Sequence, residues 1–226
     1  MLGLRNWAAV GLVLAGLSPV GVRAQDAGTA GVMTLDDLRV YMETMHIKDA
    51  DERGVRVQMQ AQKSQLPPWF PQNVLDEMTT RMLTADLPAL EYPFVKSCVN
   101  AQEMHALTAL FATPDGQRYV LAATGGMVAK EATGTDPLAA HQQMLKEDHG
   151  LPMQAIEGLP REQRALVKKV MASGAMNCFG AGFQKASGAV TDARTSAARQ
   201  VIAERRSELQ AAQQKFESEH PAAAAK

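Results

Sequence analysis

Histidine has the broadest chemistry of any side chain in this sequence, and its copies form no metal-binding pattern. They are His46, His105, His141, His149 and His220. No two lie four residues apart and no H-E-x-x-H motif occurs, so the spacing does not support a zinc site on a helix. His141 and His149 lie eight residues apart, beside Glu147 and Asp148. A surface metal site there is the alternative to a solvated polar face, which we favour.

Methionine supplies a second group of candidate ligands, because its thioether is a soft donor suited to copper. The segment from Met42 through Met45 to His46 brings two thioethers and an imidazole within five positions. Met42 and Met45 also continue the helical spacing of Leu35 and Leu38, and methionine at such spacing usually fills a core. We therefore interpret both methionines as core residues.

Other catalytic patterns are missing from the sequence. It has no G-x-S-x-G nucleophile elbow and no S-x-x-K motif. The fragment Gly180-Ala-Gly182 follows a helical segment rather than a strand, which argues against a nucleotide-phosphate site. Together with Gly174 and Gly188, these glycines indicate either close helix packing or a hinge, and both readings stay open. The sequence predicts no catalytic residue, no metal and no cofactor.

Residues 1–24 have the layout of a secretory signal peptide. Arg5 gives a basic start, Trp7 to Leu17 is an apolar run without charge, and Val22-Arg23-Ala24 ends in the small residues that a signal peptidase reads. The run is shorter than the about 20 residues of a membrane-spanning helix, so an uncleaved anchor is the less favoured alternative. We predict cleavage after Ala24 and a soluble periplasmic or secreted protein without stable membrane insertion.

The two cysteines, Cys98 and Cys178, both lie after this segment. In an oxidising compartment an isolated pair usually forms a disulfide. A redox-active pair is the alternative, but the cysteines are far apart in sequence and no C-x-x-C motif is present. A bridge closing this loop would stabilise the fold by about 4 kcal/mol. We predict a Cys98–Cys178 disulfide.

Charge and composition exclude some classes of protein. The 226-residue chain has a net charge of −1, and residues 1–24 contain two basic and no acidic residues, so cleavage leaves −3. This gives no electrostatic reason to expect a nucleic-acid partner. Only 5% of the residues are aromatic, few for a protein that stacks sugars. Alanine and methionine are plentiful and no strand pattern is convincing, which favours an all-α fold.

Helical periodicity organises the mature chain. We expect, in order, a loose arm at 25–33, an irregular multi-helix domain at 34–188, a long C-terminal helix at 189–219 and a disordered tail at 220–226. In the long helix Ile202, Leu209 and Phe216 recur every seven residues and form a narrow apolar seam. This seam permits packing on the domain or a homodimer through the C-terminal helix.

The clearest helix boundaries lie on either side of one sharp turn. Asn100 and Glu103 have the spacing of a capping box, which starts a helix. Thr113 and Pro114 are an N-cap and first helical residue, so they start the next one. Gly116 is a poor helix former and indicates close backbone packing. The pattern predicts two capped helices joined at a fixed angle.

The same segment, Glu103 to Arg118, resembles the exported bacterial family of domains of unknown function numbered two thousand and fifty-nine. That family has an acidic residue opening a helix, an ALIAFY run and then Ser/Thr-Pro-x-Gly-Gln/Lys. The matching positions are Glu103, Ala106, Leu107, Phe111, Thr113, Pro114 and Gly116. The resemblance extends from about Met78 to Met127 and departs from the family at Ala112, where Tyr is usual, and at Cys98. It implies a secreted helical protein and brings no catalytic residue.

These patterns favour a non-enzymatic interaction protein of the periplasm with an unknown protein partner. Leu159-Pro-Arg-Glu-Gln163 is similar to the L-T-x-x-Q helix starts of small periplasmic stress chaperones, with Pro in place of Thr. A chaperone-like binder of unfolded or envelope proteins is therefore the alternative. A hydrolase or a metal-binding protein is the second alternative, which requires His, Asp and Glu side chains to gather in a pocket.

Overall fold

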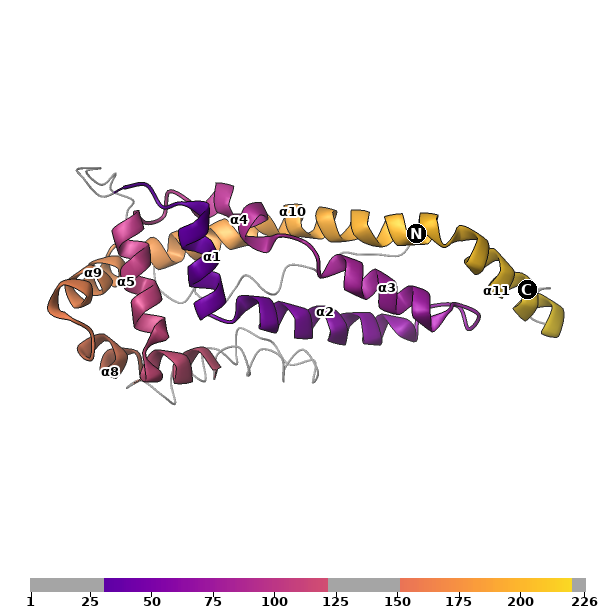
Figure 1. Ribbon diagram of the computed structural model, residues 1–226, viewed down its shortest axis with the longest axis horizontal. Coiled ribbons are helices and arrows are strands. Elements are labelled where there is room, and N and C mark those ends of the chain that lie inside the picture. Colours follow the sequence, from indigo (N-terminus) through magenta and orange to yellow (C-terminus); the bar gives the residue numbers. More distant parts are fainter. Residues whose placement is uncertain (1–30, 122–150, 221–226) are drawn as a thin grey trace. The chain divides into compact units, whose positions relative to one another are not determined.

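The structure, a computed structural model, describes residues 31–121 and 151–220, and throughout these ranges it is all-α (Figure 1). The predicted signal peptide, residues 25–30 of the arm, residues 122–150 of the expected helical domain and residues 221–226 of the expected tail lie outside the described residues. The helices with given bounds are α1 (Leu35–Thr44), α2 (Ile47–Lys63), α3 (Gln72–Met82), α4 (Leu87–Val95), α5 (Ala101–Ala112), α8 (Leu151–Glu157), α9 (Arg161–Ala172), α10 (Ala175–Glu204) and α11 (Arg206–Glu219). Residues 114–121 are also helical. No helix within the described ranges has the length and apolar content needed to cross a membrane.

The chain divides into two compact units. Unit 1 comprises Met1–Gly54 and Asp86–Gly188, and unit 2 comprises Val55–Ala85 and Ala189–Lys226. Helices α2 and α10 contribute residues to both units. Gly188, the last residue expected for the helical domain, also ends unit 1, whereas Val55–Ala85 groups with the C-terminal helices.

Helix α5 organises unit 1, because it packs against α1 on one side and α9 on another. Its apolar stripe, Met104, Leu107, Leu110 and Phe111, is buried. Tyr41 of α1 has its ring centroid 6.1 Å from those of Phe111 and Phe179. An aromatic core of this kind stabilises through burial and through edge-to-face and offset ring contacts.

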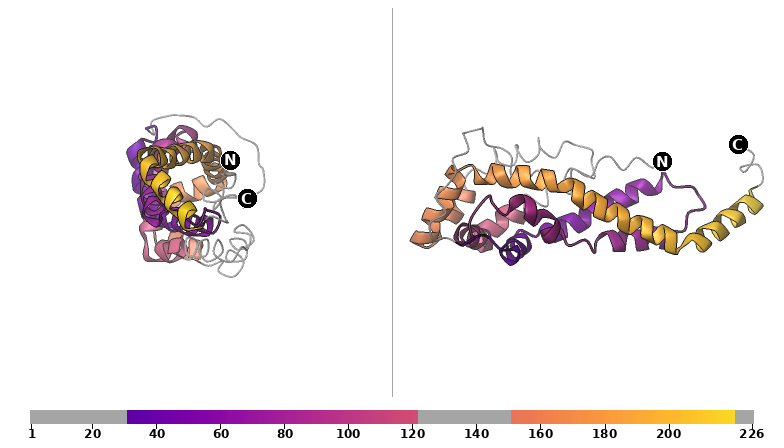
Figure 2. Two further views of the ribbon diagram at one scale, coloured as in Figure 1. Left: turned by 90° about the vertical axis from the view of Figure 1, so that its right-hand side faces the viewer. Right: turned by 90° about the horizontal axis from the view of Figure 1, so that it is seen from above.

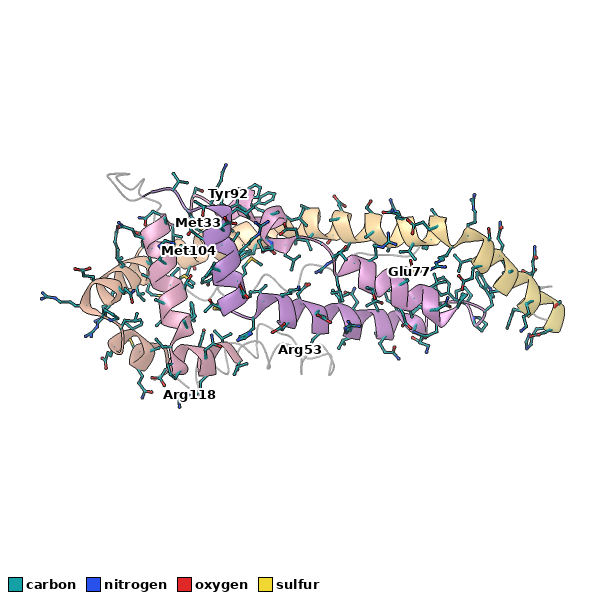
Figure 3. The ribbon with its side chains drawn as sticks, in the orientation of Figure 1. Met33, Arg53, Glu77, Tyr92, Met104 and Arg118 are labelled. Carbon is teal, nitrogen blue, oxygen red and sulfur yellow. A yellow bond between two sulfur atoms is a disulfide. The ribbon has the colours of Figure 1, made fainter. Side chains whose placement is uncertain are left out.

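Residues 31–33 correct the expectation of a loose arm. The side chain of Met33 is fully buried, and its carbonyl accepts a hydrogen bond from the Tyr92 hydroxyl at 2.9 Å (Figure 3). Val32 forms an isolated bridge with Asn100, and the Ala101 amide donates to the Gly31 carbonyl. An apolar anchor and backbone hydrogen bonds thus fix this stretch to the start of α5, which local sequence does not reveal.

Capping boxes start both α1 and α5. At the start of α1 the Thr34 side chain accepts a hydrogen bond from the Asp37 amide, and the Asp37 carboxylate accepts one from the Thr34 amide. Asn100 and Glu103 make the same two hydrogen bonds at the start of α5. These caps hold orphan amides of the first helical turn. The predicted helix start at Asn100 is therefore confirmed, and Thr34, the first residue of the expected helical domain, caps α1.

The C-terminal helix begins earlier than expected and is interrupted. Helix α10 starts at Ala175, directly after Gly174 with its φ of 76°, and ends at Glu204. Arg205 departs from helical geometry (φ −98°, ψ 16°), and the chain changes direction before α11 (Figure 2). The glycines within α10 concealed its start, because glycine is a poor helix former unless a neighbour packs against it.

Packing accounts for one of those glycines. A Cβ built on Gly182 would lie 2.7 Å from Val95 Cγ1 and 2.8 Å from the Phe94 carbonyl oxygen, both at the end of α4. At Gly188 a Cβ would meet nothing within 4 Å. The close-packing reading therefore holds for Gly182 and not for Gly188.

Candidate functional site

The described histidines are held in polar contacts of unit 1 and at the end of α11. His105 Nε2 lies 2.7 Å from Asp37 Oδ1, with the His105 side chain 67% exposed. His220 Nδ1 lies 3.1 Å from the Phe216 carbonyl oxygen. Within the ranges that the structure describes, no three His, Cys, Asp or Glu side chains are grouped to hold a metal ion. His141 and His149 lie outside the described residues.

Met42 and Met45 belong to the core. Each is 4% exposed, in the interior of unit 1 beside the buried residues of α1. Their burial agrees with the interpretation of the helical stripe and leaves their thioethers with apolar neighbours.

The predicted disulfide is confirmed. Cys98, between α4 and α5, is bonded to Cys178 on α10, with the two Cα atoms 5.5 Å apart. This separation is ordinary for a disulfide. The bridge ties the start of α10 to the segment between α4 and α5.

Glu103 of the family-like motif has a structural environment. It is 5% exposed, its Oε1 lies 3.0 Å from the Lys169 ammonium of α9, and its Oε2 accepts from the Asn100 amide at 3.1 Å. A buried carboxylate needs both a counter-charge and hydrogen bonds. Glu103 therefore joins α9 to the cap of α5 and has no free oxygen facing solvent. Leu107 and Phe111 are buried in the same core.

Thr113, Pro114 and Gly116 build the turn that follows α5. The Thr113 hydroxyl donates to the Leu110 carbonyl and accepts from the Gly116 amide at 3.0 Å. A Cβ on Gly116 would collide with the Leu110 carbonyl oxygen and lie 2.8 Å from Phe111 Cα. Only glycine permits this approach of the helix at 114–121 to α5. The predicted pair of capped helices at a fixed angle is present.

Gln117, which the sequence analysis did not single out, locks this turn to the end of α1. Its Nε2 donates to the carbonyls of Phe111 at 2.7 Å and Thr44 at 2.9 Å. Its Oε1 lies 2.9 Å from His46 Nε2. Because the two carbonyls use both amide hydrogens, Oε1 is the Gln117 atom that faces His46 Nε2. Its place directly after Thr-Pro-Asp-Gly was the available signal.

Asp37 has a perturbed carboxylate. Desolvation by burial raises the pKa of Asp37, but hydrogen bonds from Thr34 and His105 outweigh it, and the pKa lies below its ordinary value. The causes are a helix cap and a surface contact. This is the chemistry of a stabilised helix start, not of a proton-transfer group.

An open groove of about 410 Å³ lies on unit 2, along one face of α10 and α11. Its apolar lining, called its floor below, consists of Ile202, Ala203 and Leu209 of the two helices, together with Trp69 of the α2–α3 loop. Ile202 is 40% exposed, and α11 has no buried residue. The groove follows part of the predicted apolar seam. Its polar lining residues are Arg199, Arg206, Gln210 and Gln213.

A polar network behind the groove joins α3 to the junction of α10 and α11. Arg205 Nε donates to Glu77 Oε2 at 2.8 Å, and Figure 3 labels Glu77 on α3. Arg81 of α3 lies 3.4 Å from Glu77 and 3.2 Å from Glu204. The hydrogen bond and charge of Glu77 raise the pKa of Arg205. These contacts determine which face of α10 and α11 is left for the groove.

The two arginines of the groove differ from those of the network. Arg199 and Arg206 are exposed and make no ion pair or hydrogen bond with the described residues. Arg81 and Arg205, on the α3 side, are both paired with carboxylates. The groove thus combines an apolar floor with two unneutralised guanidinium groups, an arrangement that can bind an amphipathic acidic surface.

Comparison of the chain with protein families, with curated proteins and with solved structures found no match. The resemblance of Glu103 to Arg118 to an exported family therefore stays a prediction.

Proposed function

We propose that this protein is exported to the periplasm or secreted and acts, without catalysis, by binding another protein. The groove on α10 and α11 carries the proposal, because an exposed apolar floor beside a tryptophan is typical of a protein-binding surface. The layout of residues 1–24 and the family resemblance around Glu103 to Arg118 support export.

Affinity capture with the mature protein tests the proposal. The bait is the chain from Gln25 onward, purified with its Cys98–Cys178 bridge and incubated with periplasmic extract. We expect reproducible capture of a partner that a bait unfolded by reduction and urea does not retain. Failure to enrich any protein over that control would contradict the proposal. Mass spectrometry of the exported protein tests the location, since an N-terminus at Gln25 is expected and retention of Trp7 would refute cleavage.

A chaperone-like binder is the second candidate, favoured by the apolar residues of the groove, of which Ile202 is exposed and Leu209 half-buried. Such a protein would suppress aggregation of an unfolded envelope protein at stoichiometric concentration, over a range of unrelated clients. A specific interaction protein would not suppress it. A light-scattering assay with two unrelated unfolded clients separates the two functions.

A further inference from the structure

The charges around the groove are of one sign. Among the described residues that line it, Arg199 and Arg206 are the only charged ones. Both are on the solvent side, whereas Glu77, Glu204 and Glu208 are engaged in the network with α3. An occupant that desolvates the floor would therefore have to supply the counter-charges itself.

The spacing of the arginines indicates the form of the occupant. Arg199 on α10 and Arg206, the first residue of α11, are seven residues apart in sequence, about two helical turns, across the departure from helical geometry at Arg205. The lining begins at Arg199 on α10 and ends at Gln213 on α11, about 10.5 Å beyond Arg206 along α11. A helix lying alongside would present carboxylates at positions i and i+7 on one flank and apolar residues between them.

A second copy of this chain meets the requirement less well. A two-fold interface places the same patch on both subunits. This patch would then face itself with arginines as its only charged lining residues, and like charges at an interface are unfavourable. A heterologous, acidic partner removes that repulsion.

We infer that the groove is the docking site for an amphipathic acidic helix of a partner protein, with its apolar side chains against Ile202, Leu209 and Trp69 and its carboxylates on Arg199 and Arg206. The inference rests on the proposed function and names the chemical class of its partner. Recognition of this kind lays the apolar face of a helix into a groove, and flanking charges select the partner.

Trp69 provides a direct readout, because the chain has two tryptophans and the other, Trp7, is in the predicted signal peptide. The probe is a synthetic helical peptide of about 15 residues with leucines on one face and glutamates seven positions apart. The comparison peptides carry glutamine or lysine at the two glutamate positions. Titration of each peptide into the mature protein should change Trp69 fluorescence until it saturates. The glutamate peptide should bind most tightly of the three, and its affinity should fall as the ionic strength rises.

Charge reversal tests the two arginines. The Arg199→Glu/Arg206→Glu variant should bind the glutamate peptide at least about tenfold more weakly and should bind the lysine peptide in its place. The matched control is Lys185→Glu/Lys215→Glu, which makes the same change of net charge on α10 and α11 outside the groove. Circular dichroism of both variants verifies that the helices remain formed.

Three results would overturn the inference. The first is equal binding of all three peptides, and the second is binding that the arginine variant leaves unchanged. The third is sedimentation of the parent as a dimer that the arginine reversal dissociates, which would assign the groove to a second copy. The proposed function is tested separately by affinity capture. It is refuted if the parent protein captures no partner, and it stands if the parent protein and the arginine variant capture the same partner.

Discussion

A methyl group added at Gly182 and one added at Gly188 should change stability in opposite directions. Both residues lie on α10, six positions apart. The Cβ at Gly182 would sit 2.8 Å from the Phe94 carbonyl oxygen and 2.7 Å from Val95 Cγ1, while the Cβ at Gly188 would meet nothing within 4 Å. The pair separates the helix propensity of alanine from the packing of α10 on α4.

The magnitude follows from two opposing effects. Replacing glycine by alanine inside a helix stabilises by about 1 kcal/mol, so Gly188→Ala should raise the free energy of unfolding by about that amount. At Gly182 the same gain is opposed by overlap with a backbone oxygen, and overpacking of this kind costs about 1–3 kcal/mol. Because the oxygen belongs to the main chain and cannot rotate away, we expect a net loss of about 1 kcal/mol. The two variants should therefore differ by about 2 kcal/mol.

Thermal and urea unfolding of the disulfide-intact protein, followed by circular dichroism, measure the difference. For a chain of this size about 1 kcal/mol corresponds to a shift in Tm of about 2–4 °C. If Gly182→Ala is as stable as Gly188→Ala, the close approach of α10 to Phe94 is refuted. A hinge at Gly182 would give that same result, because alanine would reduce the freedom of the unfolded chain without a clash.

Three further substitutions test other contacts. Replacing Cys98 and Cys178 by alanine should lower the free energy of unfolding by about 4.5 kcal/mol in urea titrations, because the loop that the bridge closes becomes free in the unfolded chain; a loss under about 1 kcal/mol would contradict this. Tyr41→Phe removes a buried hydroxyl with no hydrogen-bond partner among the described residues. Its stability to urea should therefore stay equal or rise by up to about 1 kcal/mol, and a clear loss would reveal a partner. The pKa of Asp37 is lowered in the folded chain from its ordinary value of 3.8. The ionised carboxylate therefore stabilises the fold above pH 3.8, and this stabilisation is lost as the pH falls through the lowered pKa of the folded chain. Asp37→Asn should flatten the acid side of the stability profile, and an unchanged profile would exclude that contribution.

Local signals predicted the fold class and the helix starts. The capping boxes at Thr34 and Asn100 and the turn at Thr113 depend on hydrogen bonds within four residues, so their spacing is visible in the sequence. The bridge was predictable because the chain has two cysteines and is expected to enter an oxidising compartment. Contacts between distant segments were not predictable in this way. The Gln117 side chain donates to the Thr44 carbonyl, and Met33 is buried. In neither case does the neighbouring sequence indicate which distant segment the side chain contacts.

The seam of Ile202, Leu209 and Phe216 shows the same division most clearly. By itself the sequence determined that α10 and α11 carry an apolar stripe, because side-chain periodicity is a property of the helix alone. Only the tertiary structure decided that Arg205 is paired with Glu77, while Arg199 and Arg206 line the groove with Trp69 and meet no carboxylate among the described residues. All three are arginines on neighbouring turns, and which of them meets a carboxylate depends on where α3 packs. That position results from the summed burial of side chains distant in sequence, which no local pattern encodes.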